Sequence, residues 1–224
     1  MTYDPGFYDT ITDGSVDSAR VVVPLVLDLL DPSTVVDVGA GRGAWSSVFA
    51  EHGCKVTAVD GDYVTDPLLP VIPRDLSEPL DLDGTWDLAV SLEVAEHLPE
   101  SRAEGFVADL CSLSDAVLFS AAIPGQGGVG HVNEQPPAYW AELFERQGYA
   151  VTGALRWRIW GDARVENWYR QNLLLCLRDP ARLAHLFDGP EAAPLHVVHP
   201  VVFAANTAVG AGWRWALRAM RDTW

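Results

Sequence analysis

The segment 35–45 reads V-V-D-V-G-A-G-R-G-A-W, a β-branched run that leads into three alternating glycines and then into a helical stretch. Because glycine has no Cβ, a turn containing Gly39, Gly41 and Gly43 lets backbone N–H groups and the next helix N-terminus approach a ligand closely. The segment therefore predicts a Rossmann-like strand, turn and helix with a nucleotide-type ligand. It does not by itself choose that ligand.

Length and composition suit one large domain. The chain has 224 residues, of which 49% are hydrophobic, so it has ample material for a core. No apolar stretch reaches the length of a membrane span, and the first residues, M-T-Y-D-P, have neither the basic nor the apolar region of a secretory signal. We expect a cytoplasmic protein with no membrane partner.

The charge balance argues against nucleic acid as a partner. A net charge of −16 would repel a phosphate backbone, so a small-molecule substrate is expected instead. Lys55 is the only lysine, which leaves mechanisms that need a catalytic lysine almost without a candidate. Cys54, Cys111 and Cys176 are odd in number and lie in apolar surroundings, so we interpret them as reduced core residues.

Helical and strand patterns alternate along the chain and predict a doubly wound α/β fold, with a mostly parallel sheet and an antiparallel last strand. The first helix is expected to be capped by Ser15 or Asp17. One domain, 1–224, is expected, with an N-terminal lid and helix at 1–30, a core at 31–179 and a C-terminal appendage at 180–224. The expected helices are 18–30, from the glycines to about 52, 100–113 and 137–147, and the expected strands are 34–38, 56–60, near 71, 86–92, 116–120, 150–157 and 172–178.

Two ligands compete for the glycine turn. Gly39, Gly41 and Ala44 also satisfy the dinucleotide pattern G-x-G-x-x-G/A, which alone is a weak signal. Against a dinucleotide stands Asp37, whose negative charge suits a cationic ligand and opposes a pyrophosphate. A whole helix also precedes the first strand, and Lys55 has Glu51 rather than tyrosine four residues before it, which excludes a tyrosine-x-x-x-lysine pair.

At these residues the chain resembles the class I S-adenosylmethionine-dependent methyltransferases. D-V-G-A-G-R-G is similar to their first motif, and Asp60 matches the acidic residue that holds both ribose hydroxyls. Asp75 falls where the superfamily places an acidic residue near the adenine, although ordinary solvated loop acids are the alternative for both aspartates. The resemblance implies these cofactor-binding residues: Tyr8, Ser18, Asp37, Gly39, Ala40, Gly41, Asp60, Gly61, Asp75, Leu76, Leu92 and Glu93.

The resemblance extends over most of the chain. The segments F-Y-D-T-I-T-D-G-S-V-D-S-A at 7–19, S-L-E-V-A-E-H-L at 91–98 and F-S-A-A-I-P-G-Q-G-G-V-G-H-V-N-E-Q at 119–135 together resemble a bacterial subgroup of small-molecule and natural-product methyltransferases. In that subgroup the N-terminal segment closes over the cofactor, which suggests a lid. Its residues would be Phe7, Tyr8, Ser15 and Ser18, and a helix cap with hydrophobic anchoring is the alternative.

Methyl transfer from a sulfonium needs an aligned nucleophile and, where that nucleophile carries a proton, a base. His97 and His131 both follow predicted strands, at the sheet edge where doubly wound folds bind ligands. We expect His131 to be the general base because Gly127, Gly128 and Gly130 give its loop freedom to approach a substrate. A purely structural loop role is the alternative. Glu134 is expected to orient the acceptor or to cap the helix after it.

A divalent metal is a second hypothesis for the same edge. Glu93, Glu96 and His97 are spaced i, i+3 and i+4, so a helical turn would place them on one face, and His131 could supply a fourth ligand. The cluster resembles the E-x-x-E-H ligands of metal-dependent 2′-O-methyltransferases and ubiquinone-pathway O-methyltransferases, in which an ion polarises the accepting hydroxyl. Metal-free relatives carry the same residues for packing and capping.

Aromatic residues gather in the second half of the chain. Trp140, Trp157, Trp160, Trp168 and Tyr169 could line an apolar acceptor pocket or simply pack the last strands. The C-terminal side chains Trp213, Trp215 and Leu217 form a stripe that is compatible with a homodimer contact or with surface anchoring.

Arginines in the same region have two interpretations. Arg156, Arg158 and Arg164 could meet an anionic substrate, and a solvated face is the alternative. Gln135 could orient an acceptor hydroxyl or belong to a helix cap.

The sequence thus predicts S-adenosylmethionine-dependent methyl transfer to a small-molecule acceptor, at a hydroxyl oxygen of a natural-product intermediate. Methylation at nitrogen or carbon remains open, as do a cofactor-binding module without turnover and an NAD-dependent oxidoreductase.

Overall fold

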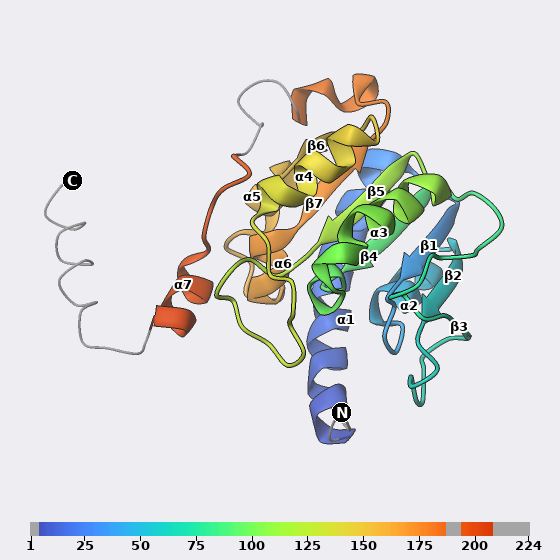
Figure 1. Ribbon diagram of the computed structural model, residues 1–224, viewed down its shortest axis with the longest axis horizontal. Coiled ribbons are helices and arrows are strands. Elements are labelled where there is room, and N and C mark those ends of the chain that lie inside the picture. The colour runs from blue at the N-terminus through green and yellow to red at the C-terminus, as the bar shows by residue number, and fades with distance from the viewer. Residues whose placement is uncertain (1–4, 187–193, 208–224) are drawn as a thin grey trace, which may run out of the picture.

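The computed structural model describes residues 5–186 and 194–207, and within these it leaves out the side chains of residues 5–12, 182 and 205–207. A seven-stranded sheet forms the centre, in the order β3-β2-β1-β4-β5-β7-β6 (Figure 1). β1 to β5 are parallel, whereas β7 is antiparallel to both β5 and β6. This confirms the predicted mostly parallel sheet with an antiparallel last strand. The strands are β1 (Thr34–Val38), β2 (Lys55–Asp60), β3 (Val71–Pro73), β4 (Leu88–Leu92), β5 (Ala116–Ser120), β6 (Ala150–Thr152) and β7 (Leu174–Leu177).

Helices cover both faces of the sheet (Figure 1). α1 and α2 pack on one face together with α5 and α6, and α3 and α4 pack on the other. The helices are α1 (Pro5–Leu30), α2 (Ala44–Glu51), α3 (Glu100–Leu113), α4 (Pro137–Arg146), α5 (Ala154–Ile159), α6 (Asn167–Asn172) and α7 (Pro200–Thr207), with 3₁₀ turns at Ala95–His97 and Ala181–Leu186.

The alternation of side chains along β1 divides them between two cores. Val35 packs with the α1 and α2 core, whereas Val36 and Val38 pack with the α3 and α4 core. Because successive strand residues point to opposite faces, Asp37 shares the face of Val35 and reaches Ser46 in α2. The strand that leads to the glycine turn is therefore buried on both sides, as expected for a central parallel strand.

The structure departs from the predicted elements in three regions. The expected strand at 150–157 ends at Thr152, and a short helix, α5, begins after Gly153, because Leu155 and Ile159 pack there onto the core. The first helix begins at Pro5, so Ser15 and Asp17 lie inside α1 and do not cap it. Helix α6 was not predicted, because its sequence N-W-Y-R-Q-N carries no clear apolar period.

The carboxyl ends of β1, β2, β4 and β5 meet at one edge of the sheet, where the chain enters the predicted functional segments. The loop after β5, helices α6 and α7 and the N-terminal half of α1 extend to the same end of the molecule (Figure 1). Within 5–186 and 194–207, no helix is both long and apolar enough to span a membrane.

Candidate active site

The glycine turn after β1 is fixed to the neighbouring strand by its backbone. The amides of Gly39 and Ala40 donate to the carbonyl of Val59, at 2.8 and 3.1 Å. Gly39, Gly41 and Gly43 all have positive φ angles, of 83°, 56° and 86°. A Cβ on Gly39 would lie 2.3 Å from Val94 Cγ2, so this glycine is required both by its conformation and by the close approach of the turn after β4.

Asp60, the last residue of β2, closes this turn. Its Oδ2 accepts a hydrogen bond from the amide of Gly41 at 2.6 Å. Its Oδ1 accepts from the amide of Gly61 and from the hydroxyl of Tyr63, each at 2.6 Å. Only 4% of Asp60 is exposed. A carboxylate held this firmly beside a glycine turn is suited to accept a hydroxyl donor at Oδ2, which has a second lone pair, and at Oδ1 where a donor replaces the hydroxyl of Tyr63.

Tyr63 is a residue that sequence reasoning missed. Its ring lies over Gly61, where a Cβ would be 2.0 Å from the ring, and 68% of the side chain is exposed. No periodic pattern marks this residue, since it lies in the loop after β2. The structure alone brings its hydroxyl to Asp60.

Asp37 is buried behind the same turn and bonded to α2. Ser46 Oγ donates to its Oδ2 at 2.6 Å. Burial raises the pKa of Asp37 to about 7, and the negative charge of Asp60 adds to the rise, whereas the bond from Ser46 opposes it. A cationic ligand nearby would favour the ionised form.

Asp75 and Leu76 follow β3, and their side chains have different environments. Asp75 is exposed, and its carboxylate accepts from Ser77 N at 2.9 Å and from Ser77 Oγ at 2.6 Å, bonds that lower its pKa. Leu76 is buried, and its carbonyl accepts from Arg102 Nε at 3.2 Å. The carboxylate of Asp75 thus belongs to a local turn, and its contact with an adenine stays a prediction.

Leu92 ends β4 and Glu93 follows it in the left-handed region, with a φ of 56°. This conformation is unusual for a residue with a Cβ, and tertiary contacts hold it. The amide of Glu93 donates to the carbonyl of Ser120 at 3.0 Å. Its carboxylate accepts from Asn172 Nδ2 at 3.0 Å and from Gln126 Nε2 at 3.1 Å.

Burial raises the pKa of Glu93, and hydrogen bonds from Asn172, Ser120 and Gln126 moderate that rise. Asn172 and Gln126 were not among the predicted site residues. They come from α6 and from the loop after β5, so only the folded chain places them beside β4.

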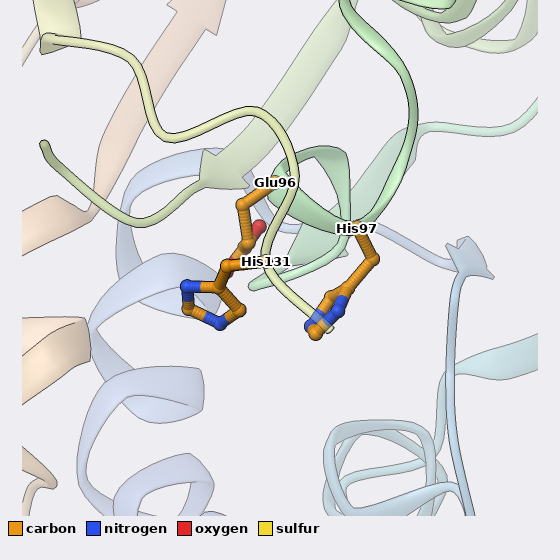
Figure 2. A group of neighbouring side chains, drawn as sticks. All are labelled: Glu96, His97 and His131. Atoms are coloured by element: carbon orange, nitrogen blue, oxygen red, sulfur yellow. The ribbon is translucent and has the colours of Figure 1, made fainter. Parts of the chain in front are cut away.

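Glu96, His97 and His131 lie together (Figure 2). One ligand atom from each residue can be chosen so that all lie within 4.8 Å of one another. The rings of His97 and His131 meet edge to face with centroids 4.8 Å apart. Glu93, which was also predicted as a metal ligand, is not part of this group. Its carboxylate is bonded to Asn172 and Gln126 instead.

Glu96 is completely buried, and neither of its carboxylate oxygens has a hydrogen-bond partner among the described residues. Burial raises its pKa well above the usual range, and the charge of Glu93 adds to this effect. Its backbone carbonyl accepts the amides of Val132 and Asn133, at 2.9 and 3.0 Å. The 3₁₀ turn after β4 is thereby joined to the segment that carries His131. Desolvation and the neighbouring His131 lower the pKa of His97.

Glu134 organises the glycine-rich loop around His131. Its Oε1 lies 2.9 Å from His131 Nδ1 and accepts the amide of Gly127 at 2.7 Å. Its Oε2 accepts the amide of Gly125 at 2.7 Å. These bonds lower the pKa of Glu134, although burial opposes them. Glu134 therefore does not cap α4, which begins after Pro136; it holds the loop and one nitrogen of the imidazole.

His131 packs tightly against a glycine of that loop. A Cβ on Gly128 would lie 2.2 Å from His131 Nε2, so the space beside this nitrogen exists only because residue 128 is a glycine. We interpret Gly128 as a residue that admits the imidazole.

The predicted lid residues divide between described and undescribed side chains. Ser18 is fully buried; its Oγ donates to Gly14 O at 2.7 Å and accepts the amide of Glu166 at 2.9 Å. Ser15 Oγ lies 3.0 Å from Tyr169 OH. Both serines thus join α1 to the region of α6, and cofactor contact by Ser18 stays a prediction. Tyr8, like Phe7, lies in α1 with its side chain outside the described set.

Among the late aromatics, Trp140 is 1% exposed and packs against Phe119, so it belongs to the core. Trp157 is 43% exposed and contacts Trp160, whose ring also packs on His199. Their part in an acceptor pocket stays a prediction. Trp213, Trp215 and Leu217 lie outside the described residues.

The arginines do not form one anion-binding group. Arg156 is completely buried and donates to backbone carbonyls of Gly153, Gln171, Pro194 and Leu195. The interpretation of Arg156 as part of a solvated face is therefore wrong, and its donors are used inside the protein. Arg164 pairs with Asp162 at 2.6 Å on the surface. Cys54, Cys111 and Cys176 are free and buried, as predicted.

A sequence profile described as a methyltransferase domain matches residues 17–120. The chain is 28% identical over 148 residues to the chloroplastic magnesium protoporphyrin IX methyltransferase of Arabidopsis thaliana. That match covers 59% of this chain and 43% of the relative, so it spans less than half of the relative's length.

Solved structures share the fold. The magnesium protoporphyrin IX methyltransferase of Synechocystis PCC 6803 with bound S-adenosylmethionine superposes with a TM-score of 0.55 at 22% identity, over 80% of this chain and 87% of that one. An amino pentose methyltransferase from Micromonospora echinaspora, involved in calicheamicin biosynthesis, gives a TM-score of 0.57 at 14% identity, over 80% and 98%.

The matched profile covers β1, the glycine turn, Asp60 and the turn after β4, whereas His131, Glu134, Gln126 and Asn172 lie beyond it. The topology agrees with the methyltransferase structures over most of the described chain. The chain is thus similar to methyltransferase domains over residues 17–120, and it shares the fold of the solved methyltransferase structures.

Proposed function

We propose that this protein is an S-adenosylmethionine-dependent methyltransferase that acts on a hydroxyl oxygen of a small-molecule acceptor, an intermediate of natural-product biosynthesis, and that His131 removes the hydroxyl proton. The observation that carries the proposal is the His131 and Glu134 pair, 2.9 Å apart at the carboxyl end of the sheet. The acceptors named for the similar proteins, a porphyrin and an amino pentose, support the small-molecule class.

The proposed cofactor site follows the glycine turn. Asp60 would accept both ribose hydroxyls, and Gly39, Ala40 and Gly41 would place backbone amides beside the methionine part, with Asp37 favouring its positive charge. Leu92 and Glu93 would contact the methionine part from the end of β4. The remaining proposed contacts are Tyr8, Ser18, Gly61, Asp75 and Leu76.

The pairing of His131 with Glu134 defines which nitrogen can act as a base. If Nδ1 carries the proton and donates it to Glu134, Nε2 keeps its lone pair. The carboxylate also stabilises the imidazolium that forms when Nε2 takes a proton. His97, whose ring touches that of His131, has a lowered pKa and would remain neutral beside it.

The bound cofactor supplies an electrophilic methyl group on a sulfonium. The acceptor oxygen would take this methyl group from the sulfur, which would keep the electron pair of the broken bond. The hydroxyl proton goes to His131 Nε2. Alignment contributes roughly 7 to 11 kcal/mol to lowering such a barrier, and a general base roughly 10² to 10⁴ in rate.

A divalent cation at Glu96, His97 and His131 is a second candidate for activating the acceptor. The observation in its favour is the Glu96 carboxylate, completely buried and without a partner among the described residues. One carboxylate and two imidazoles fit zinc, manganese or another borderline ion. The Glu134 bond to Nδ1 would orient His131 as a ligand through Nε2. This role excludes simultaneous action of Nε2 as the base.

One experiment tests the function and separates these two forms. The purified full chain is incubated with methyl-labelled S-adenosylmethionine and a metabolite extract of the source organism, with and without EDTA. We expect a labelled small-molecule product whose methyl group has the chemical stability of an ether. EDTA should not change how much of this product forms. A labelled amine or carbon product would contradict the oxygen assignment. Loss of label with EDTA, restored by one divalent ion, would favour the metal form over the base.

A further inference from the structure

The six-residue helix α6 contacts segments that are distant from it in the sequence. Tyr169 OH lies 3.0 Å from Ser15 Oγ in α1. The last two residues of α6, Gln171 and Asn172, are 0% and 2% exposed and bind different partners. Asn172 bonds toward the ends of β4 and β5, whereas Gln171 bonds toward the segment 194–199. α6 is therefore a junction between these two regions.

Asn172 belongs to a closed set of hydrogen bonds with Glu93 and Gln126. Its Nδ2 lies 3.0 and 3.2 Å from the two carboxylate oxygens of Glu93 and 2.9 Å from Gln126 Oε1. Gln126 Nε2 in turn donates to Glu93 Oε2 at 3.1 Å. Both oxygens of Glu93 are thereby oriented by an amide from another element. Such charge-assisted bonds are stronger than neutral ones.

The backbone of Glu93 explains why this orientation matters. Its φ of 56° is in the left-handed region, which a residue with a Cβ occupies only when its surroundings hold it there. The amide bond to Ser120 holds the main chain, and Asn172 and Gln126 hold the side chain. Without Asn172, Gln126 Nε2 would remain as a side-chain donor to the carboxylate.

Gln171 fastens a segment near the C-terminus to the same helix. Its Nε2 donates to Val197 O at 2.6 Å, and its Oε1 accepts the amide of His199. His199 Nε2 lies 3.0 Å from Trp160 O. The segment therefore forms backbone and side-chain bonds with α6 and with the end of α5.

Arg156 adds further hydrogen bonds between α6 and the segment 194–199. Its Nη1 donates to Gln171 O at 3.2 Å and to Leu195 O at 3.1 Å, and its Nη2 donates to Pro194 O at 2.6 Å. One buried guanidinium thus bonds both α6 and the segment 194–199. A displacement of the segment would leave carbonyls and donors unpaired, so its position and that of α6 depend on each other.

We propose that Asn172 is a positioning residue for the carboxylate of Glu93, and that Gln171 makes this position depend on the segment 194–199. The proposal rests on the proposed function where it places Glu93 beside the methionine part of the cofactor. Its consequence is that a segment more than 100 residues beyond β4 in the sequence adjusts cofactor binding through two adjacent amide side chains.

A double-mutant cycle tests whether Asn172 acts through Glu93. S-adenosylhomocysteine is titrated by calorimetry into the full-length wild type, Asn172→Ala, Glu93→Ala and the double variant. We expect Asn172→Ala to weaken binding about tenfold in the wild-type background and less than about twofold in the Glu93→Ala background, because the lost bond is to a charged group. Equal losses in both backgrounds, or no loss in the first, would overturn the positioning role.

Asn172→Asp is the second variant in case Asn172→Ala does not fold. It keeps the shape of the side chain but replaces the donor to Glu93 by an acceptor, so the same loss is expected. Circular dichroism melting checks folding. Tyr149→Phe is the matched control, because it removes buried bonds of 3.1 and 2.6 Å to Cys111 O and Ser114 O at the end of α3, on the other face of the sheet. We expect wild-type affinity for S-adenosylhomocysteine in this control.

Hydrogen exchange tests the second half of the proposal. In Gln171→Leu, amides of 197–203 should exchange at least about tenfold faster than in the wild type or in Tyr149→Phe, and affinity for S-adenosylhomocysteine should fall by more than about twofold. Faster exchange with unchanged affinity would show that the segment is attached but not coupled. Wild-type protein that binds no S-adenosylhomocysteine would overturn the proposed function, whereas the exchange measurement would still report the attachment itself.

Discussion

Asp60 Oδ2 accepts the amide hydrogen of Gly41 at 2.6 Å, so the last residue of β2 closes the turn that follows β1. The two strands are parallel neighbours, with Val38 paired with Val59, and their ends therefore lie side by side. The carboxylate holds the turn, and its proposed contact with the hydroxyl donors of a ribose depends on this position.

This relationship predicts that two aspartates contribute unequally to S-adenosylmethionine affinity, although both match acidic residues of the methyltransferase family. Asp60→Ala should weaken S-adenosylmethionine binding by roughly 10- to 100-fold, since hydrogen bonds to a charged group contribute about 1.5 to 3 kcal/mol each. Asp75→Ala should change affinity by less than about threefold, because its exposed carboxylate bonds mainly to Ser77. Calorimetry measures both constants. A larger loss at Asp75 would instead place the strongest carboxylate contact after β3.

His131 and Glu134 should act as a unit in turnover. His131→Ala is expected to lower kcat by about 10² to 10⁴ at an unchanged affinity for S-adenosylmethionine. Glu134→Gln should give a smaller loss, because a neutral amide stabilises the imidazolium less and holds the loop amides of Gly125 and Gly127 less firmly. Once the labelled product is known, single-turnover rates measure the chemical step. Turnover by His131→Ala at the wild-type rate would reject the base.

Asp37 should make stability depend on pH in a defined direction. Its pKa is about 7 in the folded protein against an ordinary value of 3.8, so between about pH 4 and pH 7 the folded state binds more protons than the unfolded chain. The unfolding free energy contributed by this group therefore falls as the pH rises through that window, by at most about 1.4 kcal/mol per pH unit. Urea denaturation of the ligand-free protein at pH 5, 6, 7 and 8 measures it.

Asp37→Asn should flatten this part of the pH dependence. Asp75→Asn is the control, because the lowered pKa of Asp75 keeps its carboxylate ionised throughout pH 5 to 8 in both states. An unchanged slope in Asp37→Asn would assign the pH dependence to other groups. S-adenosylmethionine should bind more tightly as the pH rises through 7, since a cationic ligand favours the ionised carboxylate.

Gly39 and Gly53 form a matched pair for the glycine turn. Both have positive φ, 83° and 91°, but a Cβ would lie 2.3 Å from Val94 at Gly39 and would meet nothing within 4 Å at Gly53. Gly53→Ala should destabilise by about 1 to 2 kcal/mol through its backbone alone. Gly39→Ala should cost more and also displace the turn after β4. Urea unfolding compares the two variants. Equal losses of unfolding free energy would show that the Val94 side chain moves aside without a cost in stability.

Several features of the fold could be predicted because local patterns control them. β1 and β5 were placed at their observed bounds, 34–38 and 116–120, since buried central strands are short apolar runs ending in glycine or polar residues. The strand predicted at 150–157 was wrong after Thr152, because a short apolar run does not separate a strand from a buried helix. Only the packing of Leu155 and Ile159 onto the core determines that this segment forms the helix α5.

The candidate site was predictable to a similar extent. Asp37 and Asp60 lie in the last two residues of β1 and β2, and the glycines follow β1, so their place at the sheet edge is set by where each strand ends. Tyr63, Gln126 and Asn172 lie on loops or on a helix without periodicity, and nothing local indicates their partners. The bond between Asn172 and Glu93 spans 79 residues.

The doubly wound sheet and the resemblance to S-adenosylmethionine-dependent methyltransferases could be predicted from the sequence, because strand periodicity and the glycine turn are local properties of the chain. Only the tertiary structure decided which side chains meet at the edge of that sheet. It separated Glu93 from the group of Glu96, His97 and His131, and it turned Arg156 inward. The reason is that such contacts depend on how loops and short helices pack across the strands, and hydrogen-bond partners far apart in the sequence leave no period in it.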